Sequence, residues 1–391
     1  HLAHRRQRQM CIRDRTRGTA YGVDMITVSK QDFDTSQFTF QGEMSGLKLA
    51  TSNRGETVMM FSLNDSSTHS LVHLEHVDDG SPGGSWVTET LATDTMPFQF
   101  QFDVSASGQP KLVVLDNVSG YTYHTTTSWT SLHQEIRTFN DFGTYPASSI
   151  DGNGDLHMVY SHPTTEKMYY STETETGWSN SEILSNANLS SAPSLWFDGA
   201  DMHILYRDSS LDRLERVTKS GSTWSTASEL GNDEAVGIEH VALQIPSGPT
   251  LVATTVNNSS VHELQILDID NDVSTSLTNF SDGASQLAMC IDTSNTVVLL
   301  SLDSNGVLVM HERNATTGAW SNVSMQQLSP STANDLSCTQ HGSSLIFAVQ
   351  SATDALYERN STGHWSSFGG QPLSQDGGAV SYTHLTLPTM S

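Results

Sequence analysis

The chain has 391 residues, and its 43 aspartates and glutamates outnumber its 18 lysines and arginines, which gives a formal net charge of −25. This charge argues against nucleic acids and anionic membrane surfaces as partners, because both are bound through basic patches. The sequence has no uninterrupted apolar run of the length, about 18 residues, that a transmembrane helix needs. Serine and threonine together number 98, which favours a loop-rich all-β fold over a helical one.

The two ends of the chain are predicted to be artefacts. Residues 10–14 read Met-Cys-Ile-Arg-Asp, which ATG TGT ATA AGA GAC can encode. The reverse complement of that DNA encodes Val-Ser-Tyr-Thr-His, the sequence of residues 380–384. Such an inverted relation exists only in DNA, and both ends resemble translated transposase-adapter sequence. We therefore exclude 1–15 and 380–391 from the fold prediction, and the natural ends and any signal peptide stay open.

Residues 16–43 are predicted to form an N-terminal strand segment. Its strand-like stretch, Met25–Val28, precedes the first full repeat of the chain. This stretch can pair with the last repeat and close a ring, or it can be the tail of a repeat that was cut off upstream. Either way, the repeat region itself covers residues 44–379.

Six of the seven tryptophans recur at a regular period. Their spacings are 43, 49, 46, 96 and 45 residues, and because 96 is two periods, one repeat has lost its tryptophan near Val273. The six in register are Trp86, Trp129, Trp178, Trp224, Trp320 and Trp365. A fixed period of this size indicates a repeat architecture.

Each repeat unit contains four short strand-like stretches. In the clearest unit, Pro146–Leu184, a Gly- and Asn-rich segment at 151–155 separates the first two stretches. This segment predicts a tight hairpin turn, because glycine and asparagine both accept positive φ. The unit Ala192–Leu230 repeats the pattern, with His157 and His203 in equivalent places. Seven such units predict an all-β, seven-bladed β-propeller of four-stranded antiparallel blades, with eight blades as the alternative. A β-sandwich is less favoured, because its strands need no period of four.

The units at 146–230, with a Gly-x-Leu-His-x-x-Tyr strand and a Gly-x-x-Trp turn, resemble the blades of two propeller families. These are the sialidase-like (BNR or Asp-box) propellers and the fucose-lectin propellers. The first resemblance implies glycan hydrolysis and the second implies glycan binding. The Asp-box pattern itself is eroded, because Lys219 and Ser81 stand where its aspartate belongs.

Enzymatic activity is not predicted. The sialidase resemblance implies three arginines that converge on a substrate carboxylate from the inner strands. No predicted inner strand carries an arginine, and Arg216, Arg313 and Arg359 are expected near the ends of third strands. Motifs for a nucleophile elbow, a P-loop and a zinc protease are lacking. A divergent glycoside hydrolase stays as a third hypothesis, since paired carboxylates are hard to recognise among so many acidic residues.

Four units carry a glutamate that we assign to the same point of the third strand, and the tryptophan of the unit follows 7 to 11 residues later. A carboxylate accepts hydrogen bonds from sugar hydroxyls, and an aromatic face stacks on the apolar face of a pyranose. The fucose-lectin resemblance implies an added arginine, which only one unit offers. The candidate ligand-binding residues are Glu75, Trp86, Arg207, Glu215, Trp224, Glu312, Trp320, Glu358 and Trp365.

These residues lead to two main functional hypotheses. The first is a non-enzymatic extracellular recognition module that binds neutral glycans between its blades at several sites, which raises avidity. The second is a structural or protein-interaction propeller in an extracellular assembly, in which the tryptophans pack between blades and the glutamates are solvated. The expected partners are accordingly glycans or extracellular proteins.

One segment has the spacing of a calcium loop. Asp268, Asp270 and Asp272 supply oxygen ligands at alternate positions, as hard cations require. The similar pattern at 151–155 is explained by its hairpin turn. No other metal and no organic cofactor is expected.

Cys290 and Cys338 are 48 residues apart, which is one repeat period. They are therefore predicted to occupy equivalent inner strands of neighbouring blades. Such strands are expected to diverge around the channel beyond the Cα separation of about 7 Å that a disulfide tolerates. Buried free thiols are the resulting prediction.

Nine asparagines lie in N-x-S/T sequons, the acceptor pattern for N-linked glycans. This number is a modest excess over chance and agrees with a secreted or cell-surface protein. The nine are Asn64, Asn117, Asn188, Asn257, Asn258, Asn279, Asn314, Asn322 and Asn360.

Overall fold

The structure of the protein is a computed structural model that describes most of the repeat region and one segment before it. The described ranges are 20–28, 33–41, 43–51, 57–65, 68–77, 85–94, 99–105, 110–116, 120–125, 133–137, 144–162, 165–175, 177–184, 187–231, 236–258, 261–280, 284–303, 307–327, 335–341, 344–350, 355–359 and 365–367. Both predicted adapter-derived ends lie outside these ranges, so that prediction stays untested.

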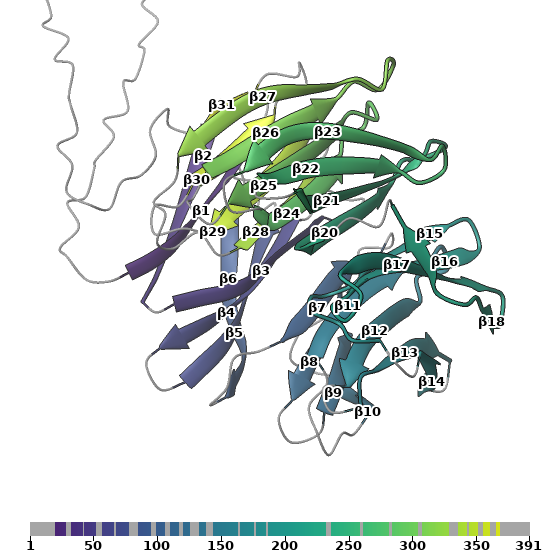
Figure 1. Ribbon diagram of the computed structural model, residues 1–391. Helices are drawn as coiled ribbons and strands as arrows, with labels where there is room; N and C mark the ends of the chain where they lie inside the picture. Colours follow the sequence, from purple (N-terminus) through teal and green to yellow (C-terminus); the bar gives the residue numbers. More distant parts are fainter. Residues whose placement is uncertain are drawn as a thin grey trace, which may run out of the picture.

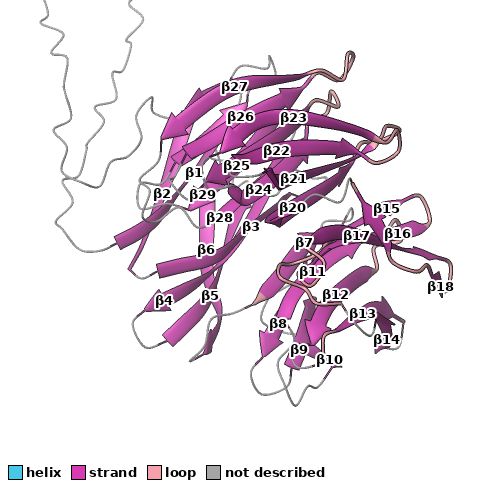
Figure 2. Cartoon of the chain, in the orientation of Figure 1, coloured by secondary structure: helices cyan, strands magenta, loops and turns pink. Residues whose placement is uncertain are grey.

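Strands and turns make up the described residues, as Figure 2 shows. Within the described ranges, no helix is long and apolar enough to cross a bilayer. Seven sheets in these ranges are antiparallel meanders of successive strands, and we number them sheet 1 to sheet 7 along the chain. The all-β propeller prediction is therefore confirmed at the level of architecture.

Sheets 1 to 3 each contain four strands. Sheet 1 consists of β3 (Glu43–Thr51), β4 (Thr57–Asp65), β5 (Thr68–Val77) and β6 (Ser85–Asp94). Sheet 2 consists of β7 (Phe100–Val104), β8 (Pro110–Asp116), β9 (Gly120–Thr125) and β10 (His133–Arg137). Sheet 3 consists of β11 (Thr144–Ile150), β12 (Leu156–His162), β13 (Lys167–Thr174) and β14 (Gly177–Leu184).

Sheet 4 differs in that its outermost strand is split into two short pieces that both pair with β17. It consists of β15 (Ser194–Asp198), β16 (Asp201–Asp208), β17 (Arg213–Ser220), β18 (Thr223–Trp224) and β19 (Ser228–Leu230). Sheet 5 consists of β20 (Val236–Gln244), β21 (Thr250–Asn258), β22 (Val261–Asp268) and β23 (Val273–Phe280).

The last two sheets again have four strands each. Sheet 6 consists of β24 (Ala284–Ile291), β25 (Val297–Asp303), β26 (Val307–Arg313) and β27 (Trp320–Gln327). Sheet 7 consists of β28 (Asp335–His341), β29 (Ser344–Gln350), β30 (Ala355–Arg359) and β31 (Trp365–Ser367).

The first strand of every sheet contacts the first strand of the next sheet, and β28 of sheet 7 returns to contact β3 of sheet 1. Figure 1 shows the last sheet beside the first. At this seam the amide of Leu49 donates a hydrogen bond of 3.1 Å to Oγ of Ser337. The sheets thus form a closed ring around their first strands.

The hydrophobic core is divided among the spaces between sheets, since each described cluster combines residues of two neighbouring sheets. Second strands are covered on both faces, so they are continuous apolar runs and do not alternate with polar residues. Examples are residues 58–61 of β4, 112–114 of β8 and 297–300 of β25, all of them buried.

Residues 20–41 contain a separate hairpin, in which β1 (Ala20–Val28) pairs with β2 (Phe33–Gln41). The alternative that Met25–Val28 pairs with the last repeat is not observed among the described residues, because β1 forms its ladder with β2. β1 does contact β29 and β30, so the hairpin lies against sheet 7. The ring is closed instead by β3 and β28.

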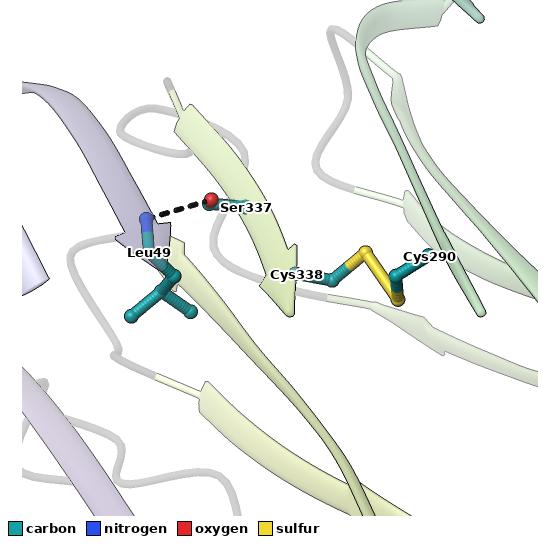
Figure 3. The surroundings of a disulfide bond; sticks show 4 residues. All are labelled: Leu49, Cys290, Ser337 and Cys338. Atoms are coloured by element: carbon teal, nitrogen blue, oxygen red, sulfur yellow. Dashed lines mark hydrogen bonds between the residues drawn. A yellow bond between two sulfur atoms is a disulfide. The ribbon is translucent and has the colours of Figure 1, made fainter. Parts of the chain in front are cut away.

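The prediction of free thiols at Cys290 and Cys338 is wrong, because the two residues form a disulfide (Figure 3). They do lie on the first strands of neighbouring sheets, β24 and β28, as the period of 48 residues indicates. The error lay in the expected divergence: these strands are in contact, and the Cα atoms are 6.0 Å apart. That distance is within the range that a disulfide accepts.

We predict that the double variant Cys290→Ala/Cys338→Ala is less stable than the parent chain by about 2–4 kcal/mol, because the cross-link closes a loop of 48 residues in the unfolded chain. Urea unfolding with and without dithiothreitol measures this difference. The parent midpoint should fall on reduction while the double variant stays unchanged. An equal response of both chains to dithiothreitol would contradict the prediction.

Candidate functional site

Three of the repeating tryptophans have described side chains, and each lies within the first two residues of a fourth strand and packs against the preceding sheet. Trp178 joins a cluster with Val113 of sheet 2, and Trp320 joins the cluster between sheets 5 and 6. Trp224 contacts Tyr170 of sheet 3. In sheet 5 the corresponding strand begins at Val273, whose side chain is 52% exposed, as the missing tryptophan indicated. Trp178, Trp224 and Trp320 therefore serve first as contacts between sheets.

Two further predicted tryptophans are described only by their strand register. Trp86 pairs with His76, and Trp365 pairs with Arg359. Their side chains lie outside the described part of the structure, and Trp129 lies outside it altogether. Trp196, the one tryptophan out of register, is a buried residue of β15 and stacks on His203 with ring centroids 5.1 Å apart.

Three of the four predicted glutamates occupy equivalent register positions. Glu75, Glu312 and Glu358 each come directly before the residue that pairs with the tryptophan of the same sheet. Glu215 does not, because Lys219 is the partner of Trp224 and the equivalent residue is Thr218. The predicted equivalence of all four glutamates is therefore wrong for Glu215, which lies three residues earlier on β17.

The register also separates the glutamate from the tryptophan within a sheet, because neighbouring strand positions point to opposite faces. In sheet 6, Glu312 pairs with Val298, which faces sheet 7, while Trp320 packs toward sheet 5. In sheet 1, Glu75 pairs with Val58, which faces sheet 2. The expected pair of Glu312 and Trp320 in one sugar site is thus not formed.

Glu215 is the buried member of an ion-pair network that extends to the partly exposed Arg213 and Glu229. Its Oε2 accepts a hydrogen bond of 2.5 Å from the Tyr206 hydroxyl, and its Oε1 accepts bonds of 3.1 and 2.6 Å from Nε and Nη2 of Arg213. Arg213 also donates 2.8 Å to Glu229. Burial, and next the hydrogen bond to Glu215, raises the pKa of Tyr206 far above its usual range. Both oxygens of this carboxylate are thus already occupied by protein donors.

Arg207 faces away from Glu215. It pairs in register with Leu214, whose side chain packs toward sheet 5, whereas Tyr206 and its partner Glu215 face sheet 3. The Arg207 guanidinium donates 2.9 Å to Oγ of Ser190 and forms an ion pair with Asp212. The structure therefore does not bring Arg207, Glu215 and Trp224 together.

A different set of side chains gathers around Trp224, in the space between sheets 3 and 4. The ring of Trp224 meets that of Tyr170 edge-on at 5.2 Å, and Lys219 Nζ lies 5.4 Å from the Tyr170 centroid. The Tyr170 hydroxyl is 2.6 Å from Nδ1 of His157, whose Nε2 is 3.6 Å from a carboxylate oxygen of Asp151. We call Asp151, His157, Tyr170, Lys219 and Trp224 the Trp224 cluster.

Local turn chemistry positions the charged members of this cluster. Asp151 accepts hydrogen bonds of 2.9 Å from the amides of Asn153 and Asp155, which fixes the hairpin between β11 and β12. Burial acts to raise its pKa, but these amides and His157 together outweigh burial and lower it. Burial lowers the pKa of His157, although Asp151 opposes this effect. Around neutral pH Asp151 is therefore a carboxylate and His157 a neutral imidazole.

Sequence reasoning missed most of the Trp224 cluster. It identified Trp224, treated His157 only as the equivalent of His203, and named neither Tyr170 nor Lys219 as a site residue. The available signal was the register itself, since Lys219 pairs with Trp224 and Tyr170 lies on the face of β13 that meets sheet 4. The relation of Tyr170 to Trp224 crosses between two repeats, so one repeat read alone does not reveal it.

The predicted calcium ligands have separate partners. Asp268 accepts hydrogen bonds from the amide and the side chain of Asn271, and Asp270 accepts 2.6 Å from the amide of Thr250. The described part of the chain contains no group of three histidine, cysteine or acidic side chains that could hold a metal ion. Calcium binding at Asp268, Asp270 and Asp272 stays a prediction without support from this geometry.

No family model matches the sequence, and no curated protein matches it either. Among solved structures, SapL1 lectin in complex with alpha methyl fucoside is similar with 12% identity and a TM-score of 0.47, covering 70% of this chain and 95% of that one. A mutant Aleuria aurantia lectin in complex with Fucalpha1-6GlcNAc is similar with 8% identity and a TM-score of 0.44, covering 72% of this chain and 96% of that one. A protein from Bacteroides uniformis, proposed to be a 6-phosphogluconolactonase, is similar with 14% identity and a TM-score of 0.49. The match covers 77% of this chain and 91% of that one. At such identities these similarities say nothing about what this chain binds.

We predict that Tyr206→Phe destabilises the protein by about 1.5–3 kcal/mol, because it removes a hydrogen bond to a buried carboxylate. The urea midpoint of unfolding measures the effect. Tyr145→Phe is the matched control, since Tyr145 is 38% exposed and should tolerate the same change. Equal midpoints for the two variants would show that the Tyr206–Glu215 bond contributes nothing.

Proposed function

We propose that this protein is a non-enzymatic recognition module that binds neutral glycans between its blades, and that the Trp224 cluster is one of its sites. The observation that carries the proposal is that Trp224 is only partly buried and shares its inter-sheet surface with Tyr170, Lys219 and His157. An aromatic ring beside hydrogen-bonding side chains is the combination that a pyranose needs, with one apolar face and polar edges.

The charge balance of the cluster favours a neutral sugar. Lys219 brings one positive charge and Asp151 one negative charge, while burial keeps the pKa of His157 low and its imidazole neutral near pH 7. The overall charge of −25 adds long-range repulsion of anionic ligands. Lys219 and His157 are suited to hydrogen-bond sugar hydroxyls, for which no formal charge on the ligand is required.

We further propose that sheets 1 to 7 are the seven blades of the ring and that the β1–β2 hairpin lies outside it. Support comes from the closed series of contacts between first strands. An extracellular or cell-surface setting is part of the proposal, because disulfides such as Cys290–Cys338 persist in oxidising compartments. Further sites between other blades would raise avidity without new contacts within any one site.

A glycan array followed by calorimetry with the bound sugar tests this proposal. Trp224→Ala should weaken binding at least about tenfold, which corresponds to about 1.4 kcal/mol, because the stacking surface is lost. Lys219→Met should weaken it in the same direction. Trp320→Ala is the matched control, since it removes an equivalent tryptophan from the space between sheets 5 and 6.

Thermal unfolding of every variant establishes that a loss of binding is not a loss of folding. Binding that survives Trp224→Ala but not Trp320→Ala would move the site to another pair of sheets. A folded parent chain that binds no glycan on the array would contradict the proposed function.

A structural or protein-interaction propeller is the second candidate. Two observations favour it: Trp178 and Trp320 pack into the clusters between sheets, and Glu215 is held in an ion-pair network. In that case the Trp224 cluster serves only to join sheets 3 and 4. Trp224→Ala would then lower the unfolding temperature of a protein that binds no sugar.

A further inference from the structure

Two of the nine sequons, those of Asn188 and Asn314, have both of their required side chains among the described residues, and the two differ in exposure. Asn314 follows β26 and begins the loop that leads to Trp320 of β27. Asn314 and Thr316, the two chemically required members of its sequon, are both exposed. We infer that Asn314 is a site of N-linked glycosylation, a modification that goes beyond the proposed binding function.

The loop holds the Asn314 side chain in a defined conformation. Its Oδ1 accepts hydrogen bonds of 2.9 Å from the amides of both Thr316 and Thr317. The backbone amide of Asn314 donates a hydrogen bond of 2.9 Å to the carbonyl of Ala319, and its backbone carbonyl accepts one of 2.8 Å from the amide of Gly318. Gly318 has a φ of 71°, a conformation that glycine adopts without strain. The loop therefore keeps the sequon at its surface.

This geometry leaves the reactive groups of the sequon available. The side-chain carbonyl of Asn314 is used within the turn, while its amide nitrogen Nδ2 makes no hydrogen bond to any described residue. The hydroxyl of Thr316 likewise makes none within the described part of the chain, because Thr316 takes part in the turn through its backbone amide. An accessible amide nitrogen next to an accessible hydroxyl is what transfer to a sequon requires.

Asn188 provides the contrast within the same molecule. It is half-buried, and its backbone carbonyl accepts hydrogen bonds from the amide and the hydroxyl of Ser209. The hydroxyl of Ser190, the third member of that sequon, accepts 2.9 Å from the Arg207 guanidinium. Folding therefore engages the Asn188 sequon, and we expect it to be modified less than Asn314.

The reaction needs an oligosaccharide donor that is linked to a lipid through a diphosphate. The bond between sugar C1 and the diphosphate oxygen breaks, and a bond forms between C1 and Nδ2 of Asn314. Nδ2 loses one proton to a base of the transferase, and the lipid diphosphate leaves. Such transfer occurs in the secretory pathway, an oxidising setting in which a disulfide such as Cys290–Cys338 persists.

The position of the glycan also has a physical consequence. The loop precedes β27, the outermost strand of sheet 6, whose outer edge has no strand partner in the described sheet. An unpaired edge can pair with strands of other molecules, and natural proteins cover or interrupt such edges. A large hydrophilic glycan at Asn314 would hinder that pairing, at a loop distant in sequence from the Trp224 cluster.

The test is to secrete the chain from a eukaryotic cell and to analyse the Asn314 peptide by mass spectrometry before and after peptide-N-glycosidase treatment. We expect most Asn314 to carry a glycan and to become aspartate on treatment. Asn314→Gln should remove the modification. Thr316→Ala should remove it too, although it retains Asn314 and the backbone amide that supports the turn.

Asn188→Gln is the matched control and should leave the Asn314 glycan in place. A secreted, disulfide-bonded chain with unmodified Asn314 would overturn the inference. Unchanged occupancy in Thr316→Ala would overturn it as well, since the modification would then not follow the sequon.

Discussion

The packing of each sheet between two others is the constraint on which the rest of this structure depends. A four-stranded sheet with apolar residues on both faces cannot expose either face to water. Burial at about 25 cal/mol per Å² of apolar area makes the closed ring favourable only when every sheet has two neighbours. This requirement explains why the second strands contain continuous buried apolar runs, at 58–61, 112–114 and 297–300. The contact between β28 and β3 closes the ring and gives the first and last sheets their second neighbours.

Polar contacts between sheets add orientation to this packing. Lys111 of sheet 2 reaches Glu173 of sheet 3 at 2.7 Å, and the disulfide ties sheet 6 to sheet 7. Glu173 also accepts a hydrogen bond of 3.3 Å from the amide of Leu156, so the ion pair is joined to the sheet ladder. The Trp224 cluster belongs to the same kind of surface. It combines a partly buried tryptophan with a tyrosine, a histidine, a lysine and an aspartate from two neighbouring sheets.

The period of the tryptophans predicted the propeller architecture and the places of the fourth strands, because burial between sheets imposes the same residue on each repeat. The period of 48 residues also placed Cys290 and Cys338 on equivalent strands. It could not supply their separation, which depends on how far neighbouring strands diverge. The number of residues between the glutamate and the tryptophan also gave the wrong register for Glu215, because this number includes a turn whose length differs between repeats. The turn between paired residues has two residues after Ser220 but six after Arg313, so equal spacings do not imply equal register.

The Trp224 cluster was the part that sequence reasoning could reach least. Trp224 and Lys219 come from one repeat, and Tyr170 and His157 come from another, so their proximity exists only after two sheets pack together. Composition and charge argued against nucleic acids as partners from the start, and that expectation stays a prediction.

The most direct test of the account is a ¹H–¹⁵N spectrum of the tryptophan indoles during titration with the sugar that the protein binds. The account predicts that the Trp224 indole shifts with sugar concentration, while those of Trp178 and Trp320, packed between other pairs of sheets, stay in place. A titration in which the Trp224 signal is constant while another indole shifts would contradict the assignment of this site.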